Sequence, residues 1–164
     1  MDLDGYTLEG LLLTAIRSEM DARVVYSTLA DRVENALLSN RLTFLAAEEE
    51  RHQALLESEY RRRFGGRDPE PPDDSPVPLP EIEIPGEDFV LSEILTQAME
   101  AEMAARDFYL SLAGRFEDAP ETRTMLLHFA RMEMGHYHLL EAERASIETF
   151  EEYDIDWGMM HVGP

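Results

Sequence analysis

Two parts of the sequence carry the same set of carboxylate and imidazole side chains at nearly the same spacing. Each part has one isolated glutamate, followed about thirty residues later by Glu-x-x-His. The two sets are Glu19 with Glu49 and His52, and Glu102 with Glu133 and His136, offset by 83 to 84 residues. Four carboxylates and two imidazoles in this order predict a two-metal site inside a four-helix bundle.

The Glu-x-x-His spacing suits metal binding because of helix geometry. Residues three apart lie about 60° from each other on one helix face and one turn along it, so both side chains reach one centre. Carboxylate oxygens with one imidazole per metal suit iron or manganese and are too hard for copper(I) or a structural zinc. Two divalent cations would balance four carboxylates. We therefore expect two iron ions, with manganese as an alternative.

The six ligands divide into two roles. Glu49 and Glu133 lie on the ligand-rich helices, and we predict that they bridge both metals. The other ligands would bind one metal each, as two terminal pairs: Glu19 with His52, and Glu102 with His136.

Two tyrosines follow the isolated glutamates at equal distance. Tyr26 and Tyr109 each lie seven residues, or about two helical turns, after Glu19 and Glu102. Each hydroxyl could donate to a ligand carboxylate or to a bound oxygen species and so orient the site. Packing in the core explains the two tyrosines equally well.

Some residues near the six ligands are alternative ligands, and others are not expected to bind metal. A single Glu-x-x-His in a glutamate-rich helix is a weak signal, whereas two of them in register are hard to explain by chance. Register between the halves favours Glu49 and Glu102 over three nearby carboxylates. His138 should face solvent, His128 is read as structural, and the methionines near the site, Met132 among them, as core or surface. The three carboxylates are Glu48, Glu50 and Glu100.

Helical periodicity predicts four helices, over residues of about 7–32, 36–64, 89–115 and 119–149. Asn35 is expected to cap the second helix, and Gly65-Gly66 to end it. Asp118 is expected to cap the fourth helix, with Pro120 in its first turn. Turns near residues 34 and 118 lie midway between the ligands, as antiparallel hairpins require.

A proline-rich stretch over 67–88 separates the two hairpins and cannot be helical. In polyproline geometry it would span about 68 Å, whereas a helix over 36–64 is about 44 Å long. The stretch can therefore return along the whole bundle and leave its flanking helices parallel. The alternation Glu81-Ile82-Glu83-Ile84 suggests a surface crossover with its isoleucines turned inward, and a disordered hinge is the alternative. The tail over 150–164 is expected to fold back or to contact a second subunit.

Composition limits the range of functions. The chain of 164 residues is most simply one domain over 1–164, with 44% hydrophobic residues. Its net charge of -21 argues against nucleic acid and anionic membranes as partners. The sequence has no cysteine, which excludes thiolate metal sites and a rubredoxin-type module. With no signal-peptide core or membrane-spanning run, a cytoplasmic location is expected.

On these residues the chain resembles the ferritin-like di-iron carboxylate superfamily, most closely its rubrerythrin-like branch. The resemblance covers 7–149 and implies an all-α, ferritin-like four-helix bundle of two hairpins joined by a long crossover. It also implies a carboxylate-bridged di-iron centre. Rubrerythrins carry a further glutamate one turn after the ligand of the third helix, where this chain has Ala105. The remaining six-ligand set is similar to a bacterioferritin-type ferroxidase centre.

The resemblance implies a di-iron oxidoreductase that reduces hydrogen peroxide or dioxygen with electrons from an external donor. A ferroxidase for iron storage or detoxification, and a non-catalytic metal-binding bundle, are the alternatives. A homo-oligomer is expected, with a dimer favoured for the enzyme.

Overall fold

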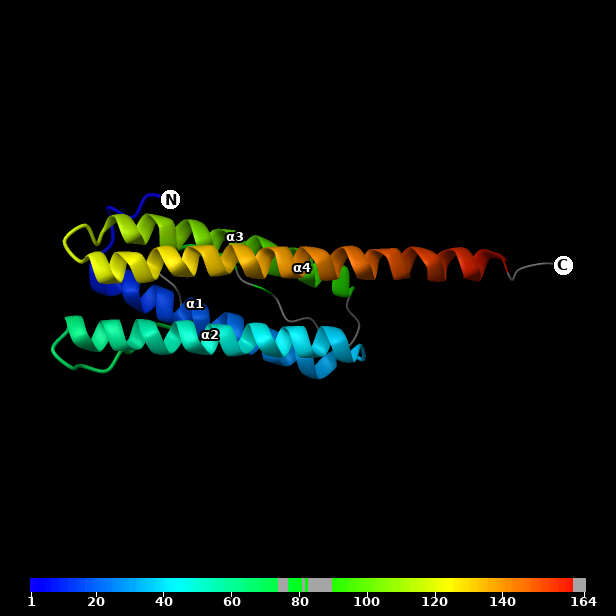
Figure 1. Cartoon of the computed structure of the whole chain (residues 1–164), viewed down its shortest axis with the longest axis horizontal. Helices are drawn as coiled ribbons and strands as arrows, with labels where there is room; N and C mark the ends of the chain where they lie inside the picture. The colour runs from blue at the N-terminus through cyan, green and yellow to red at the C-terminus, as the bar shows by residue number, and fades with distance from the viewer. Residues whose placement is uncertain (74–76, 81, 83–89, 161–164) are drawn as a thin grey trace.

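The computed structural model describes residues 1–73, 77–80, 82 and 90–160. Four helices make up the described part of the chain, without β-strands, so the fold is an all-α bundle (Figure 1). They are α1 (Leu8–Arg32), α2 (Ala36–Arg63), α3 (Leu91–Gly114) and α4 (Pro120–Met160).

Side-chain caps fix where the first two helices begin. The Thr7 hydroxyl accepts from the Gly10 N–H at 3.1 Å, and α1 starts at Leu8, directly after Thr7. The Asn35 side chain accepts from the N–H groups of Leu37 and Leu38 at 3.0 and 3.2 Å. These bonds satisfy backbone donors that have no partner within the helix. The predicted cap at Asn35 is confirmed.

Two glycines end α2, as the sequence predicts. Gly65 and Gly66 have φ angles of 69° and 83°, a region that favours residues without a Cβ atom. The Gly66 N–H donates to the Arg61 carbonyl at 2.7 Å, which satisfies one of the last carbonyls of the helix.

Helix α4 departs from the sequence prediction at both ends. Its first intrahelical bond runs from the Arg123 N–H to the Ala119 carbonyl, so Ala119 holds the cap position instead of Asp118. The helix does not end near Thr149 but continues to Met160, past the ends of the other helices (Figure 1). The expectation that the tail folds back is therefore wrong for 150–160, while contact with a second subunit stays a prediction. Residues 161–164 lie outside the described residues.

The helices form two antiparallel hairpins, α1 with α2 and α3 with α4. They pack closely within each hairpin, and the hairpins approach each other more loosely. In Figure 1, α2 and α3 run in the same direction, so α3 begins at the end of the bundle opposite to the one where α2 ends. The parallel direction of α2 and α3, which the sequence predicts for a long crossover, is confirmed.

The described part of the crossover packs on the bundle. Val77 is buried in the core, and Ile82 is half-buried against it. Ile82 is thus turned inward as predicted, and Ile84 lies outside the described residues.

The core is divided into two apolar clusters, one toward each end of the bundle. Both clusters take side chains from all four helices. The first is centred on Leu12, Ile16, Tyr60, Phe108 and Phe129, and the second on Leu29, Leu42, Leu45, Leu95 and Leu140. The polar residues of the repeated motifs lie between them along the sequence of each helix. A polar layer in an apolar core is costly unless its groups are paired or bind ions.

Candidate metal centre

The six residues of the repeated motifs meet at the middle of the bundle, and all are buried. Each offers a ligand atom in one of two overlapping groups whose atoms lie within 4.8 Å of one another. The first group is Glu19, Glu49, His52 and Glu133, and the second is Glu49, Glu102, Glu133 and His136. The structure therefore brings together all six residues selected from the sequence.

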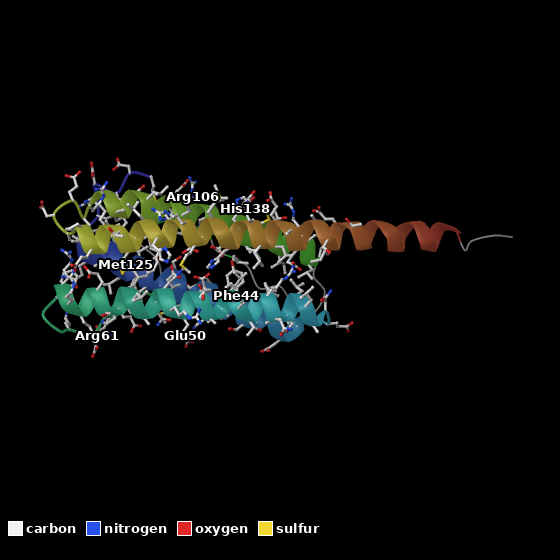
Figure 2. All side chains as sticks on the ribbon, in the orientation of Figure 1. Phe44, Glu50, Arg61, Arg106, Met125 and His138 are labelled. Carbon is white, nitrogen blue, oxygen red and sulfur yellow. The ribbon has the colours of Figure 1, made fainter. Side chains whose placement is uncertain are left out.

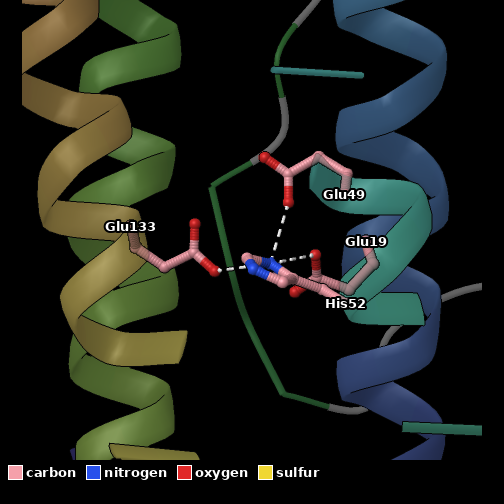
Figure 3. A group of neighbouring side chains, drawn as sticks. All are labelled: Glu19, Glu49, His52 and Glu133. Carbon is pink, nitrogen blue, oxygen red and sulfur yellow. Dashed lines mark ion pairs between the residues drawn. The ribbon is translucent and has the colours of Figure 1, made fainter. Parts of the chain in front are cut away.

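Three carboxylates from three helices surround the ring nitrogen of His52. His52 Nδ1 lies 3.3 Å from a carboxylate oxygen of each of Glu19, Glu49 and Glu133 (Figure 3). Glu49 is on the same helix as His52, whereas Glu19 and Glu133 approach from α1 and α4.

The second histidine has an equivalent environment. His136 Nδ1 lies 3.0 Å from Glu133, 3.1 Å from Glu49 and 3.6 Å from Glu102. Glu49 and Glu133 thus contact both imidazoles, each with one oxygen toward His52 and the other toward His136. Glu19 and Glu102 each contact one imidazole. This sharing is compatible with the predicted division into bridging and terminal ligands, which stays a prediction.

Several of these buried atoms have no hydrogen-bond partner among the described residues. They are Glu19 Oε2, Glu49 Oε1, His52 Nδ1, Glu133 Oε1 and His136 Nδ1. The nitrogens and oxygens face one another at contact distance without the geometry of a hydrogen bond. Buried polar atoms without a partner are rare and call for an ion or another ligand. Oxygen and imidazole donors that converge in this way fit two divalent metal ions.

The charges of the cluster interact strongly. Burial by itself lowers the pKa of His52, but the three facing carboxylates outweigh it and raise that pKa to about 12. The pKa of His136 is raised for the same reason. Burial would raise the pKa of Glu49 and Glu133, yet contact with both imidazoles lowers it. In the metal-free protein these four groups therefore form two imidazolium–carboxylate pairs.

The two unshared carboxylates behave differently. Burial, reinforced by the charges of Glu49 and Glu133, raises the pKa of Glu19 and of Glu102 well above its usual range. Both groups therefore keep a proton more readily than an exposed glutamate. Protonation of these two groups would reduce the repulsion between the four carboxylates in the metal-free cluster.

The two tyrosines tie the hairpins together. The Tyr26 hydroxyl donates to Glu102, and the Tyr109 hydroxyl donates to Glu19, in both cases across the bundle. Burial and the neighbouring carboxylates raise the pKa of both phenols, which keeps them protonated as donors. Helical spacing places each tyrosine on the same helix face as the glutamate of its own helix. The structure shows that each tyrosine bonds the glutamate of the other helix instead.

The outer side of the His52 ring meets two residues to which the sequence gave no role in the site. Its Nε2 atom lies 3.4 Å from the sulfur of Met132, and its ring packs on Phe129 with centroids 4.4 Å apart. Both come from α4, across the bundle from His52. The sequence contains no signal for this contact beyond the position of Met132 directly before Glu133.

A small pocket borders the cluster on the side of α1 and α3. Its volume of about 30 Å³ compares with about 10–15 Å³ for one water-sized probe. Four of the ligand carboxylates line it, and small side chains form much of its wall. The lining residues are Ser18, Glu19, Ala22, Tyr26, Glu49, Ile82, Ala101, Glu102, Ala105 and Glu133. Ala105 thus lies beside Glu102 and leaves open space that a longer side chain would fill.

The alternative residues lie elsewhere. Glu50 is exposed and pairs with Arg23 at 3.2 Å, and Glu100 is exposed. Glu48 is buried but pairs with Arg51. His138 lies on the outside of the bundle, as predicted, beside Glu141 (Figure 2). His128 is also exposed.

Fold, ligand groups and comparisons agree on the class of protein: the chain belongs to the ferritin-like di-iron superfamily. Within this superfamily, residues 10–84 match the family model of rubrerythrin. The chain is also similar to a solved structure of a hypothetical protein from Pyrococcus furiosus, with 31% identity and a TM-score of 0.81. That match covers 91% of this chain and 95% of the other. No curated protein sequence matches the chain.

Across the described residues, none of the helices combines the length and apolar character that a membrane crossing needs. The helices instead carry charged residues along their exposed faces.

Proposed function

We propose that the protein is a di-iron oxidoreductase that reduces hydrogen peroxide or dioxygen with electrons from an external donor. The observation that carries the proposal is the pair of buried ligand groups that share Glu49 and Glu133. Their unpartnered nitrogen and oxygen atoms provide a preformed site for two ions. Iron is the preferred metal for this donor set, with manganese as the alternative.

The residues would hold the metals in the roles that their contacts suggest. Glu49 and Glu133 would bridge, and Glu19 with His52 and Glu102 with His136 would each complete one position. A pair of iron(II) ions supplies the two electrons that the reduction of one peroxide molecule requires.

The surrounding chain controls what reaches the centre. The adjoining pocket accommodates only molecules of about the size of water or peroxide. The two apolar clusters exclude bulk solvent from above and below the polar layer. Tyr26 and Tyr109 hold Glu102 and Glu19 in place by hydrogen bonds.

A ferroxidase for iron storage or detoxification is the second candidate, and Ala105 favours it. This residue lines the pocket beside Glu102, so the centre offers six protein ligands and no further carboxylate on that side. An open position of this kind suits a centre that takes up and releases iron. Storage also requires a hollow shell of many subunits, whereas the enzyme is expected as a dimer, so the solution mass separates the two functions.

These 164 residues contain no cysteine and so hold no rubredoxin-type module, and we propose an external electron donor. The pronounced negative charge of the chain favours a donor with a basic docking surface.

The decisive experiment begins with protein reconstituted anaerobically with iron(II), which we expect to bind about two ions per chain. Stopped-flow absorption then follows its oxidation by hydrogen peroxide and, separately, by dioxygen. Faster reaction with peroxide, with turnover sustained by an added donor, supports the oxidoreductase. Faster reaction with dioxygen and accumulation of ferric mineral supports the ferroxidase.

Glu50→Ala provides a matched control, since Glu50 is an exposed neighbour of the proposed bridging residue Glu49. It should react like the parent, whereas Glu49→Ala should not. If the iron-loaded parent reacts with neither oxidant, the oxidoreductase proposal is wrong and a non-catalytic metal-binding bundle is the better description.

A further inference from the structure

The pocket beside the ligand carboxylates has an inner end and an outer rim that differ in burial. The inner end consists of buried residues, and three of its carboxylates keep an oxygen without a hydrogen-bond partner among the described residues. The rim consists of half-buried residues. The inner residues are Glu19, Tyr26, Glu49, Glu102 and Glu133, and the rim residues are Ser18, Ala22, Ile82, Ala101 and Ala105. Because the rim is partly exposed and the ligands are not, the pocket offers a route from solvent to the proposed metal centre.

Helices α1 and α3 contribute matching small side chains to this rim. Ser18 and Ala22 lie about one turn apart on α1, and Ala101 and Ala105 take the equivalent places on α3, each 83 residues further along the chain. Residues four apart share a helix face, so each pair presents short side chains to the same pocket. Side chains this short leave open space between the two helices beside the carboxylates.

Ile82 is the one bulky side chain among the rim residues, and it comes from the crossover, outside the four helices. It packs against the second apolar cluster, which fixes its position at the rim. Its branched side chain is stiff at χ1 and so adjusts little to a larger molecule. With Ile82 in place the pocket has a volume of about 30 Å³.

We propose that Ile82 determines which oxidants reach the metal centre, because it restricts the route between α1 and α3 to hydrogen peroxide and dioxygen and excludes alkyl hydroperoxides. The inference rests on the proposed function and deepens it by defining the substrate class. Both kinds of peroxide undergo the same reaction: the O–O bond breaks and takes up two protons and two electrons, one from each iron(II) ion. Hydrogen peroxide yields two water molecules, and an alkyl hydroperoxide yields one water molecule and an alcohol. Discrimination between them therefore comes from size.

The first test measures binding without turnover. Protein loaded anaerobically with Co²⁺ is titrated with formate and with trimethylacetate, two carboxylates that differ by a tert-butyl group, and the visible absorption of Co²⁺ reports binding. The parent should bind trimethylacetate about 10-fold or more weakly than formate. Ile82→Ala removes three carbon atoms from the rim and should abolish most of this difference.

Leu79→Ala is the matched control for this titration. Leu79 is also a half-buried residue of the crossover, but it packs against the first apolar cluster and does not line the pocket. Its truncation removes the same number of carbon atoms and should leave the preference for formate unchanged.

The second test follows the stopped-flow oxidation of the iron(II)-loaded protein by hydrogen peroxide and by tert-butyl hydroperoxide. Ile82→Ala should raise the rate constant for the alkyl hydroperoxide about 10-fold or more. The gain with hydrogen peroxide should be much smaller, because this molecule already fits the route.

A narrowing variant serves if Ile82→Ala fails to fold. Ala101→Val reduces the rim from the side of α3 and should slow the reaction with hydrogen peroxide. Ala104→Val is its control, because Ala104 is half-buried on the same helix and does not line the pocket.

A parent that accepts the bulky and the small molecule equally, equal effects of Ile82→Ala and Leu79→Ala, or equal effects of the valines at 101 and 104 would each overturn the inference and leave the proposed function intact. A Co²⁺-binding parent whose iron(II) form reacts with neither oxidant would refute the proposed function, and the carboxylate titration would still decide the role of Ile82. A parent that binds no Co²⁺ would overturn both.

Discussion

Single atoms in the cluster differ in whether the protein itself gives them a partner. Glu102 and Glu19 each have an oxygen that accepts from a tyrosine. By contrast, one oxygen each of Glu19, Glu49 and Glu133 and the Nδ1 atoms of both histidines have no hydrogen-bond partner among the described residues. The outward-facing atoms are thus fixed by the protein, and the inward-facing atoms are left for ions. This arrangement is the residue-scale basis of the proposed metal centre.

The shared glutamates give the first prediction. Because Glu49 and Glu133 belong to both ligand groups, Glu49→Ala or Glu133→Ala should abolish binding of both metals. Glu19→Ala should weaken mainly one. Elemental analysis after anaerobic iron loading measures the stoichiometry. Equal losses in all three variants would show that the bridging assignment is wrong.

The tyrosines give the second prediction. Tyr26→Phe or Tyr109→Phe removes the donor to a buried carboxyl group, which should lower the free energy of unfolding by about 1–3 kcal/mol. Chemical denaturation of the metal-free protein measures the loss. Tyr137→Phe is the control, because this half-buried ring packs at the second apolar cluster, and it should cost less than about 0.5 kcal/mol. An equal loss in Tyr26→Phe and in the control would count against the cross-hairpin bonds.

At the scale of elements, the helix ends set the heights at which the ligands meet. The turn between α1 and α2 fixes Glu19 opposite Glu49 and His52, and the turn between α3 and α4 does the same for the second set. Asn35 caps α2 at this first turn through bonds to two backbone N–H groups. In the described part of the crossover, Val77 is buried in the first apolar cluster and ties this segment to the bundle.

The cap at Asn35 gives the third prediction. Asn35→Ala leaves the backbone donors of α2 unpaired and should cost about 1 kcal/mol of stability. Asn35→Ser retains an acceptor at the cap and should stay close to the parent. Denaturant midpoints of the three proteins provide the comparison. If the alanine and serine variants are equally destabilised, the side-chain cap does not stabilise α2.

At the scale of the whole molecule, a polar layer lies between two apolar clusters, and its charge has to be balanced. In the metal-free state protons provide the balance, since both imidazoles and the two unshared glutamates have raised pKa values. Metal ions would replace these protons. Folding, protonation and metal binding are therefore linked.

This linkage gives the fourth prediction. An unfolded histidine titrates near pH 6.5, whereas folded His52 keeps its proton to about pH 12. Between these values the folded protein binds more protons than the unfolded chain, so its stability falls as pH rises. The raised pKa values of Glu19 and Glu102 act in the same direction above about pH 4.5. The lowered pKa values of Glu49 and Glu133 stabilise the fold above about pH 4.5, and this contribution is lost in acid.

Denaturation of chelator-treated protein should accordingly give a higher free energy of unfolding at about pH 6 than at about pH 8.5, with Mn²⁺ stabilising the protein more at the higher pH. A variant with both His52 and His136 changed to Gln should lose much of this slope. A flat profile of the metal-free parent between these pH values would contradict the protonated cluster.

Local rules in the sequence determined much of this protein. Helical periodicity, the cap at Asn35, the glycines after α2 and the prolines of the crossover depend on neighbours within a few residues. The six ligand candidates could be selected because the sequence repeats them at one spacing, and helix geometry fixes the face on which they lie. The extension of α4 to Met160 was missed, although residues 150–160 contain no proline that would stop a helix.

Only the tertiary structure decided which residues of different helices touch. Three kinds of contact cross from one hairpin to the other. Tyr26 and Tyr109 each bond the glutamate of the opposite hairpin. Glu49 and Glu133 contact both imidazoles, and Met132 contacts His52. Spacing along one helix specifies the face of a side chain but not the rotation and height of the opposite helix. Those depend on how the two apolar clusters pack together, which is a property of all four helices at once.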